Sequence, residues 1–513
     1  MYYITLRDTF YCRIKILVFT LTLFIGIRSA VSQEMPGLTN SNFAGSNAVL
    51  INPANMVLSK IYFDVHLFTA GAFVQNNLVY IPANDYKIMD FLNSSKDLPT
   101  YPPNNNNFTY YKNALDKYAF NSERIIGPSA MMLYGDHAFS FQTSVRTALS
   151  ATNIPYEIGV FSIEGLRYPP FYNVNFWSKN ERVGAMAWGE VSFSYAYAFK
   201  KEFRDHWSAG ISVKRLMGYS AGFMRVKELN YVVLNDSTLN IRNLTADAGF
   251  SLPVDFDNND FPIHDPFFKG GGFGFDLGVT FTRMKQGFQR NNPRYICEQP
   301  YSDYKYRVGV SLLDIGAINF KHNAQLHQFV DGNAFWQNFD TTNYSNINQL
   351  ARQFSEVLLG DPDASLKGSK FRMGLPSAIS LQFDYHYRQN IYINATIIQP
   401  LVIWKYGVVR PAQLAVTPRF ETDWFEFSLP FSLYQYRLPR LGAAVRLGVV
   451  SLGTDRLGTL LGMTDLTGVD IYASVKFNLR KGRCLRSKGT SYCENEEYGF
   501  TNKLLRAFKN RVR

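Results

Sequence analysis

Stretches in which apolar and polar side chains alternate residue by residue restrict the fold of this chain more than any other feature. The clearest is ISLQFDYHYRQNIYINATIIQP at residues 379–400. Ile, Leu, Phe and Tyr take its odd positions as far as 387, and Ser, Gln, Asp, His and Arg take the even ones. The alternation resumes after the turn-like Arg388-Gln389-Asn390. Because successive side chains of a strand point to opposite faces, these residues predict a hairpin with one apolar and one polar face.

The same two-faced pattern recurs along most of the chain. Each run has about the ten residues that a tilted strand needs to cross an outer membrane. The further runs lie at residues 138–148, 191–199, 272–282, 443–453 and 468–479.

Hydropathy and composition indicate what the apolar faces meet. Beyond the N-terminal residues no stretch approaches ~18 uninterrupted apolar residues, so we expect no membrane-spanning helix. Mean hydropathy is -0.15 and aromatic residues make up 16%. Closed barrels combine modest hydropathy with membrane residence, because half of each strand faces a polar interior. We therefore predict an all-β, antiparallel transmembrane barrel of about 14 strands (12–16) over residues 61–479. A soluble secreted β-sandwich is the alternative.

Connector lengths also favour a barrel. Residues 135–137 and 200–206 join strands tightly, whereas residues 82–124, 234–270 and 320–375 form long connections. Short turns at one end and long extracellular loops at the other are typical of outer-membrane barrels.

Two positions interrupt the pattern. In YRVGVSLLDIG at residues 306–316, the apolar parity would place Asp314 in lipid, where a charge is costly. Either the strand leaves the membrane before Asp314, or Leu312-Leu313 forms a bulge. Pro430 cannot donate a ladder hydrogen bond, so we expect a bulge or a strand end there.

Both ends of the chain differ from its body. Residues 1–32 carry basic residues, an apolar run and a small-x-small site, which predicts a cleavable signal peptide, with an N-terminal membrane anchor as the alternative. The net charge is +12, of which the leader holds +3 and a basic periplasmic tail at 480–513 holds +7. Basicity confined to the ends argues against nucleic-acid binding. Cys484 and Cys493 could pair in an oxidising compartment.

SNFAGSNAVLINPANM, at residues 41–56, resembles the N-terminal segment of the FadL-like outer-membrane barrels, which include fatty-acid transporters and PorV-type secretion barrels. This resemblance implies that residues 33–60 form a small hatch inside the barrel, with Asn52, Pro53 and Ala54 at its turn. Residues 306–316 and 468–479 look still closer to an uncharacterised family of Bacteroidota outer-membrane proteins.

Candidate catalytic motifs are weak, and we expect no enzyme activity, cofactor or metal site. The seven histidines lack metal-ligand spacing. The glycines of GGGFGFDLG at 270–278 open a strand rather than a helix, so small residues that allow close approach explain them better than phosphate binding. Asp64/His66 and Asp384/His386 share a parity, but residues i and i+2 of a strand lie ~6.6 Å apart, too far for a direct hydrogen bond.

The polar parity predicts the groups that face the interior or the hatch: Arg146, Lys214, Asp276, Asp384, His386, Arg446 and Lys476. Both signs occur, which favours charge networks over an ion-selective ring. The leading hypothesis is a hatch-gated binding or passage protein for a small hydrophobic or amphipathic molecule, embedded in outer-membrane lipid. The alternative is a non-transporting barrel that binds secretion or surface proteins.

Overall fold

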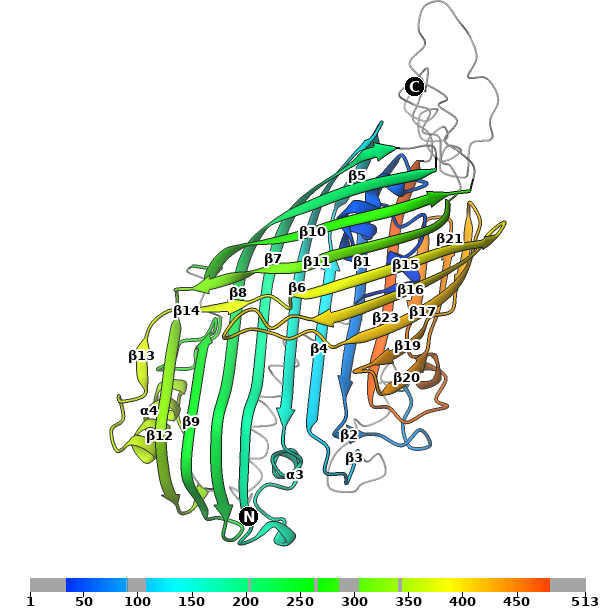
Figure 1. Ribbon diagram of the computed structural model, residues 1–513. Helices are drawn as coiled ribbons and strands as arrows, with labels where there is room; N and C mark the ends of the chain where they lie inside the picture. The colour runs from blue at the N-terminus through cyan, green and yellow to red at the C-terminus, as the bar shows by residue number, and fades with distance from the viewer. Residues whose placement is uncertain are drawn as a thin grey trace, which may run out of the picture.

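The protein is a closed antiparallel β-barrel in the computed structural model, which describes residues 34–88, 90, 108–201, 204–262, 266–285, 304–339 and 344–479. The predicted signal peptide and tail, with Cys484 and Cys493, lie outside these residues. Fourteen strands close the barrel, so the predicted fold class is confirmed. Figure 1 shows them running obliquely around the barrel.

The first nine strands of the barrel wall run from β1 to β16, and two of them are interrupted once: β4 continues into β5 and β14 into β15 along the same neighbours. They are β1 (Phe63–Asn76), β4 (Lys117–Ile126) with β5 (Ser129–Tyr134), β6 (His137–Ile154), β7 (Asn175–Lys201), β8 (Asp205–Val233), β10 (Gly270–Met284), β11 (Tyr304–Phe320), β14 (Phe371–Gly374) with β15 (Ala378–Arg388), and β16 (Ile391–Pro400).

Five more strands complete the fourteen. They are β17 (Gln413–Glu421), β18 (Phe425–Ser428) with β19 (Phe431–Tyr434), β20 (Leu438–Leu441) with β21 (Ala443–Leu447), β22 (Val450–Thr454) and β23 (Gly468–Leu479). The last strand pairs with the first, from Phe63 opposite Leu479 to Gln75 opposite Gly468. This pairing closes the sheet and leaves the wall without a free edge.

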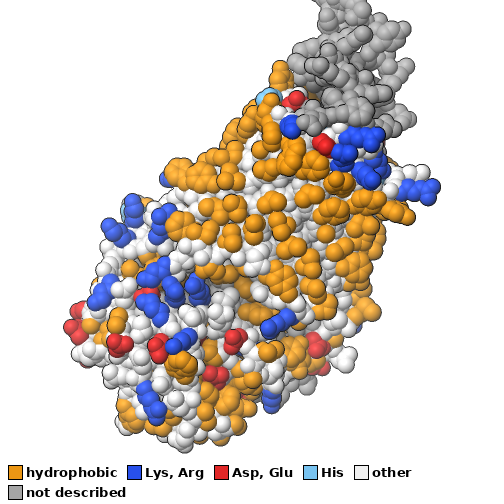
Figure 2. Space-filling view, in the orientation of Figure 1, with side chains coloured by type: hydrophobic (Ala, Val, Ile, Leu, Met, Phe, Trp, Pro, Cys, Tyr) orange, Lys and Arg blue, Asp and Glu red, His pale blue; other side chains and the backbone are white. Residues whose placement is uncertain are grey.

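The strands are two-faced, as the sequence predicts. In the hairpin of β15 and β16, the side chains of Leu381, Phe383 and Ile393 are 38–45% exposed, whereas those of Ser380, Gln382, Asp384, His386, Tyr392 and Asn394 are buried. Figure 2 shows apolar side chains forming a broad band across the face of the barrel in view. The polar side chains face the interior.

A bulge in β11 accounts for the position of Asp314. The register slips between Phe275 and Leu277 of β10, which lie opposite Ile315 and Leu312 of β11. The extra residue lies at Leu313-Asp314, where Asp314 has φ +54°. Both side chains are buried, so the bulge turns the carboxylate inward. Of the two alternatives for this position, the β-bulge is therefore correct, although it lies one residue later than expected. The strand does not end before Asp314. Pro430 lies in the interruption between β18 and β19, as predicted.

Several strands continue beyond the barrel and form a lobe. Strand β8 pairs with β10 along residues 205–218 and with β9 (Leu239–Ser251) along residues 221–233. Strand β9 in turn pairs with β12 (Ala324–Trp336), and β12 pairs with the short β13 (Leu366–Gly368). The 29 residues of β8 exceed the ~10 that cross a membrane, and its second half runs on beside β9 and β12 (Figure 1).

The lobe corrects part of the predicted loop pattern. Residues 234–270 and 320–375 were expected to be long loops, yet they contain β9, β12, β13 and the helix α4 (Ile347–Leu359). The alternation fails there because bulges interrupt the pairing of β9 and β12, one of them next to Asp331 at φ +52°. Outside the band, the outward positions also need not be apolar.

Short elements complete the described structure. The helix α3 (Tyr156–Glu164) and the 3-10 helix η4 (Pro169–Phe171) connect β6 to β7, and α5 (Leu457–Leu460) connects β22 to β23. Strands β2 (Val79–Tyr80) and β3 (Thr109–Tyr110) form a separate ribbon. Among the described residues, no helix has the length and apolarity needed to cross a bilayer.

The two-faced hairpin predicts how a charge affects assembly. Phe383→Arg places a guanidinium in the middle of the apolar face and should destabilise the inserted barrel by roughly 2–4 kcal/mol. Tyr387→Arg is the matched control, because Tyr387 lies next to the turn at the edge of the band, where the cost falls to about 0–1 kcal/mol. Urea unfolding in lipid vesicles measures both. Equal destabilisation by the two substitutions would contradict the assigned band.

Candidate functional site

The N-terminal segment, residues 34–60, lies inside the barrel (Figure 1). It consists of α2 (Pro36–Thr39) and two 3-10 helices, η1 (Gly45–Leu50) and η2 (Pro53–Leu58). Most of its side chains are buried. Because η2 packs against β7, β8 and β10 while α2 packs against β17 and β21, the segment bridges well-separated parts of the wall.

Asn52, Pro53 and Ala54 form the start of η2. The Asn52 side chain accepts a hydrogen bond from the Ala54 amide at 2.9 Å, which caps the helix, and Pro53 occupies its first turn. The Asn52 amide group also donates to Gln382 Oε1 at 2.9 Å and to Thr280 Oγ1 at 3.2 Å. One side chain thus shapes the turn and attaches it to the wall.

Glycines of the wall allow this turn to approach closely. A Cβ on Gly210 of β8 would lie 2.5 Å from the Ala54 nitrogen, and a Cβ on Gly278 of β10 would overlap the Asn52 side chain. The glycines at 270–278 therefore serve close packing, in part against the N-terminal segment. This agrees with the expectation from the sequence that these small residues allow close approach.

A buried cluster of charges centres on Asp314 of the bulge. Its carboxylate accepts hydrogen bonds from Arg146 at 2.9 and 2.9 Å, from Lys214 at 2.7 Å and from Arg410 at 2.6 Å. Lys214 also contacts Asp276 at 2.7 Å. We call this set, completed by Glu34 and Glu190, the Asp314 cluster.

Arg410 connects the Asp314 cluster to the N-terminal segment. It lies on the connection between β16 and β17 and donates to Glu34 Oε1 at 2.8 Å as well as to Asp314. Its side chain is 3% exposed, and that of Glu34 is 6% exposed. A buried pair of this kind fixes the position of the segment relative to the wall, because separating its members leaves uncompensated charge.

A second buried cluster surrounds Asp384. Arg419 of β17 donates to Asp384 at 2.8 and 3.0 Å and to Glu421 at 2.6 Å, and the Tyr304 hydroxyl donates to Asp384 at 2.6 Å. Asn42 of the N-terminal segment donates to Glu421 at 2.7 Å. This cluster therefore also holds the segment.

Arg446 and Lys476 make the remaining contacts of this kind. Arg446 donates to Glu426 at 3.1 Å, and Glu426 accepts from Ser41 at 2.6 Å. Lys476 donates to the backbone carbonyls of Phe43 and Ala44. Each of these groups lies on the inner face of the wall and contacts the N-terminal segment directly or through one neighbour.

The members of the two Asp/His pairs bond to other residues. His386 lies 2.5 Å from the Gln389 carbonyl oxygen and stacks on Tyr392, and Asp384 is bonded to Arg419 instead. His66 Nε2 lies 3.9 Å from Asp64 Oδ2, and Ser46 contacts both residues. Within the described residues, no group of three or more His, Cys, Asp or Glu side chains could hold a metal ion.

Sequence reasoning missed several members of the clusters. Glu34, Glu190, Arg410, Arg419, Glu421 and Glu426 lie on strands or connections whose partners cannot be known without the tertiary structure. The sequence did indicate Asp314 as unusual, because its charge interrupts the apolar parity of residues 306–316.

Small polar cavities remain between the N-terminal segment and the wall. One of ≈ 30 Å³ is lined by residues that include Asn42, Arg307, Gln382 and Asp384, and one of ≈ 10 Å³ lies beside the Asp314 cluster. A cavity needs roughly 10–15 Å³ to hold one water molecule, so these spaces fit water rather than a larger solute.

The interior is apolar on the side nearer the lobe. An apolar cluster there contains Met186, Trp188, Phe223, Phe371, Met373 and Val408, with Tyr406 packed against it. Residues 406–412 cross this region: Gly374 donates to the Tyr406 carbonyl at 2.9 Å, and Val409 donates to Ser150 Oγ at 2.9 Å. We call residues 406–412 the inner loop.

Basic side chains gather beside the inner loop. Arg182 of β7 lies opposite Arg225 of β8, and Arg225 lies opposite Asp247 of β9. Lys227 and Lys405 each contact Asp247 at 3.2 Å. Burial raises the pKa of the Asp247 carboxyl, but its bonds to the two ammonium groups outweigh this effect and lower the pKa below its ordinary value. We call these four basic residues the basic mouth.

The family comparison covers most of the chain. A family model described as "Family of unknown function (DUF5723)" matches residues 53–455. A search of curated proteins found no match.

Three solved structures are among those with some likeness to this chain. The toluene transporter TbuX of Ralstonia pickettii is 11% identical, with a TM-score of 0.38, and the match covers 88% of this chain and 99% of that chain. The toluene transporter TodX of Pseudomonas putida is 8% identical, with a TM-score of 0.37 and coverages of 87% and 96%. A TodX deltaS2S3 mutant, a monoaromatic hydrocarbon channel, is 8% identical, with a TM-score of 0.40 and coverages of 88% and 100%.

The Asp314 cluster predicts a large effect of a small substitution. Asp314→Asn removes the charge that three buried cations share and should lower the free energy of unfolding by about 3–5 kcal/mol. Asp363→Asn is the matched control, because Asp363 and its partner Arg352 are 66% and 60% exposed, and exposed pairs contribute about 0–1 kcal/mol. Urea unfolding of the two variants measures the difference. A loss at position 314 no larger than that at 363 would contradict the cluster's role.

Proposed function

Since the chain belongs to DUF5723, a family of unknown function, we propose from its own geometry that it is an outer-membrane barrel that binds a small hydrophobic or amphipathic molecule and lets it pass. The observation that carries the proposal is the division of the interior. The N-terminal segment fills one part with polar contacts, whereas an apolar cluster under the inner loop occupies the part nearer the lobe.

In the first step, the barrel would bind the solute from the side of the lobe. The inner loop lies over the apolar cluster, with Phe223 and Tyr406 stacked at 4.1 Å between ring centroids. An apolar solute gains free energy by leaving water for such surroundings. The basic mouth beside the loop would hold an anionic head group if the solute has one, because its four cations face a single carboxylate, Asp247, among the contacts described there.

Passage then requires the N-terminal segment to move. The described cavities beside it fit only about one or two water molecules. Arg410 would couple the two steps, because it lies on the inner loop and bonds to Glu34 of the segment and to Asp314 of the wall. A shift of the loop on ligand binding would strain these bonds and favour release of the segment.

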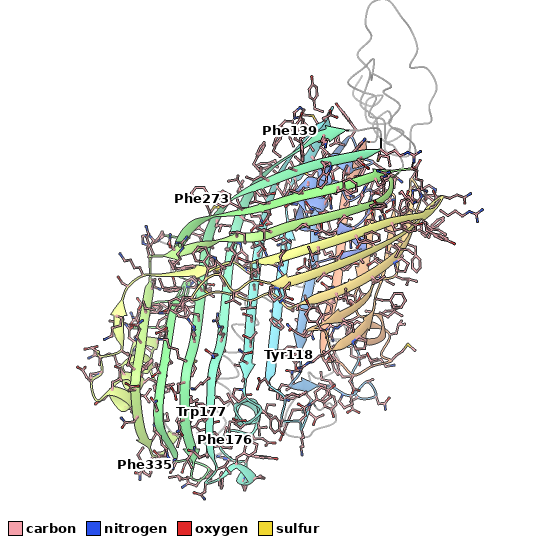
Figure 3. The ribbon with its side chains drawn as sticks, in the orientation of Figure 1. Tyr118, Phe139, Phe176, Trp177, Phe273 and Phe335 are labelled. Atoms are coloured by element: carbon pink, nitrogen blue, oxygen red, sulfur yellow. The ribbon has the colours of Figure 1, made fainter. Side chains whose placement is uncertain are left out.

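A second candidate function is protein binding by the lobe, the role of a secretion or surface-anchoring barrel. The observation that favours it is exposed apolar surface far from the barrel: Trp177, Val330 and Phe335 are 57–60% exposed. Figure 3 shows Trp177 and Phe335 near the far end of the lobe. Exposed apolar surface of this kind often marks a protein contact.

Location is the first test of the proposal. The mature protein should fractionate with outer membranes and should migrate differently on gels before and after heating, because a closed barrel resists unfolding by detergent. Recovery in a detergent-free soluble fraction would contradict the membrane assignment on which both candidate functions depend.

Uptake tests the passage function. Cells with and without the protein are given a neutral aromatic hydrocarbon, an anionic medium-chain carboxylate and a disaccharide. We expect faster uptake of the first two and no change for the disaccharide. The double variant Arg225→Gln/Lys405→Gln should slow uptake of the carboxylate about tenfold, a change worth about 1.4 kcal/mol, and leave the hydrocarbon unchanged.

Arg352→Gln is the matched control, since Arg352 is an exposed cation on α4 outside the basic mouth. Uptake that does not differ between cells with and without the protein would refute the passage function. In that case, proteins that co-purify with the full chain, and are lost with Trp177→Ser/Phe335→Ser, would support the second candidate.

A further inference from the structure

A row of basic side chains lies on the outer face of the barrel where the apolar band ends on the lobe side. Its members are Arg215 of β8, Arg372 of β14, and Lys321 and Lys370 at the adjoining ends of β11 and β14. All four are exposed. Figure 2 shows Lys and Arg side chains gathered along this edge of the hydrophobic band. We call this set the outer basic row.

Strand register brings these residues together. Asn319 of β11 pairs with Arg372 on one side and with Gly271 of β10 on the other. The Arg215 guanidinium extends toward Gly271, since a Cβ on that glycine would lie 3.3 Å from Arg215 Nη2. Lys321 and Lys370 follow immediately beyond the last pair of the same ladder, Phe320 with Phe371.

Alternation confirms that the row faces outward. Arg215 lies between the buried Lys214 and Leu216, and Arg372 lies between the buried Phe371 and Met373. Since neighbouring side chains of a strand point to opposite faces, both guanidinium groups lie on the outside of the wall.

Aromatic rings hold the two arginines in place. The Arg215 guanidinium carbon lies 5.0 Å from the centroid of Phe273, and that of Arg372 lies 4.2 Å from the centroid of Trp404. Figure 3 shows Phe273 at the edge of the barrel. Stacking on a ring limits the rotamers of a guanidinium without using its N–H donors. Arg215 donates through Nη1 to the Gly272 carbonyl at 3.4 Å, and its other donors point to no described partner.

The row lacks a carboxylate partner of the kind that Arg283 has. Within the described part of the chain, none of its four members forms an ion pair. Arg283, on the same strand β10 but at the opposite edge of the band, is paired with Asp205 at 2.6 Å. The row therefore carries four positive charges that no ion pair within the described residues neutralises.

Apolar surface adjoins the row on both sides. Phe273, Phe275 and Leu277 of β10 are 42–55% exposed toward the band, and Phe267 and Phe268 are 52% and 40% exposed beside the start of β10. A ligand that fits this surface has an anionic group next to hydrocarbon chains. Inorganic phosphate would use the charges alone and would leave the aromatic side chains without a contact.

We propose that the outer basic row binds the phosphate groups of a phosphorylated glycolipid in the outer leaflet, while the acyl chains lie along the apolar face of β10 and β11. The inference rests on the proposed location in an outer membrane. The edge on the lobe side lies opposite the edge where the chain enters β1 and leaves β23, which is the periplasmic one in the proposed topology. Guanidinium groups bind phosphate through paired hydrogen bonds, which favours arginine at such a site.

The test uses the full chain purified in detergent and three probes: bisphosphorylated lipid A, the same lipid with its phosphates removed, and inorganic phosphate. We expect the bisphosphorylated lipid to bind at least about tenfold more tightly than the dephosphorylated lipid. The double variant Arg215→Gln/Arg372→Gln should lose this difference, and inorganic phosphate at the lipid's concentration should not compete.

Arg283→Gln is the matched control, because it removes a surface arginine of the same strand at the opposite edge, and it should bind as the unsubstituted protein does. Heat-modified migration shows whether each variant is folded. Equal binding of the two lipids, equal binding by the double variant, or full competition by inorganic phosphate would overturn the inference.

The failure of this inference can be distinguished from failure of the proposed function. A protein that fractionates with outer membranes and accelerates uptake of the hydrocarbon, but does not discriminate between the two lipids, retains the proposed function and loses only the lipid site. A protein that does not fractionate with outer membranes loses both.

Discussion

The burial of Asp314 is the constraint on which much of the interior depends. A carboxylate removed from water is stable only when it is paired and hydrogen-bonded, and Asp314 achieves this through Arg146, Lys214 and Arg410. Those cations come from β6, β8 and the inner loop, so one carboxylate connects three separate parts of the chain. Because Arg410 also binds Glu34, the N-terminal segment joins the same set of charges.

Barrel size explains why the interior needs additional chain. About eight strands enclose a space that the inward side chains can fill, whereas barrels of 16–18 strands leave an aqueous channel. Fourteen strands fall between these cases. Here the N-terminal segment and the inner loop occupy the interior, one held mainly by polar contacts and the other against apolar side chains. Glycines such as Gly210 and Gly278 provide the room that the segment requires.

The fold was more predictable than the site, for a physical reason. The face of Phe383 or Asp384 follows from its parity alone, because a strand has a period of two. The partner of Asp384 does not, because Arg419 comes from another strand and the pairing depends on register. Glu34, Arg410 and Glu421 were missed for this reason. The lobe was missed because bulges in β9 and β12 interrupt the period from which strands are recognised.

By itself, the sequence determined a two-faced antiparallel barrel, about fourteen strands in the wall and a break at Pro430, since these depend on the alternation of side chains and the chemistry of single residues. It also marked Asp314 as an exception without resolving it. Only the tertiary structure decided that the bulge turns Asp314 inward, that Asn52 meets Gln382, and that Arg215 and Arg372 face outward on one edge. These outcomes depend on strand register and on contacts between residues far apart in the chain, which local patterns do not contain.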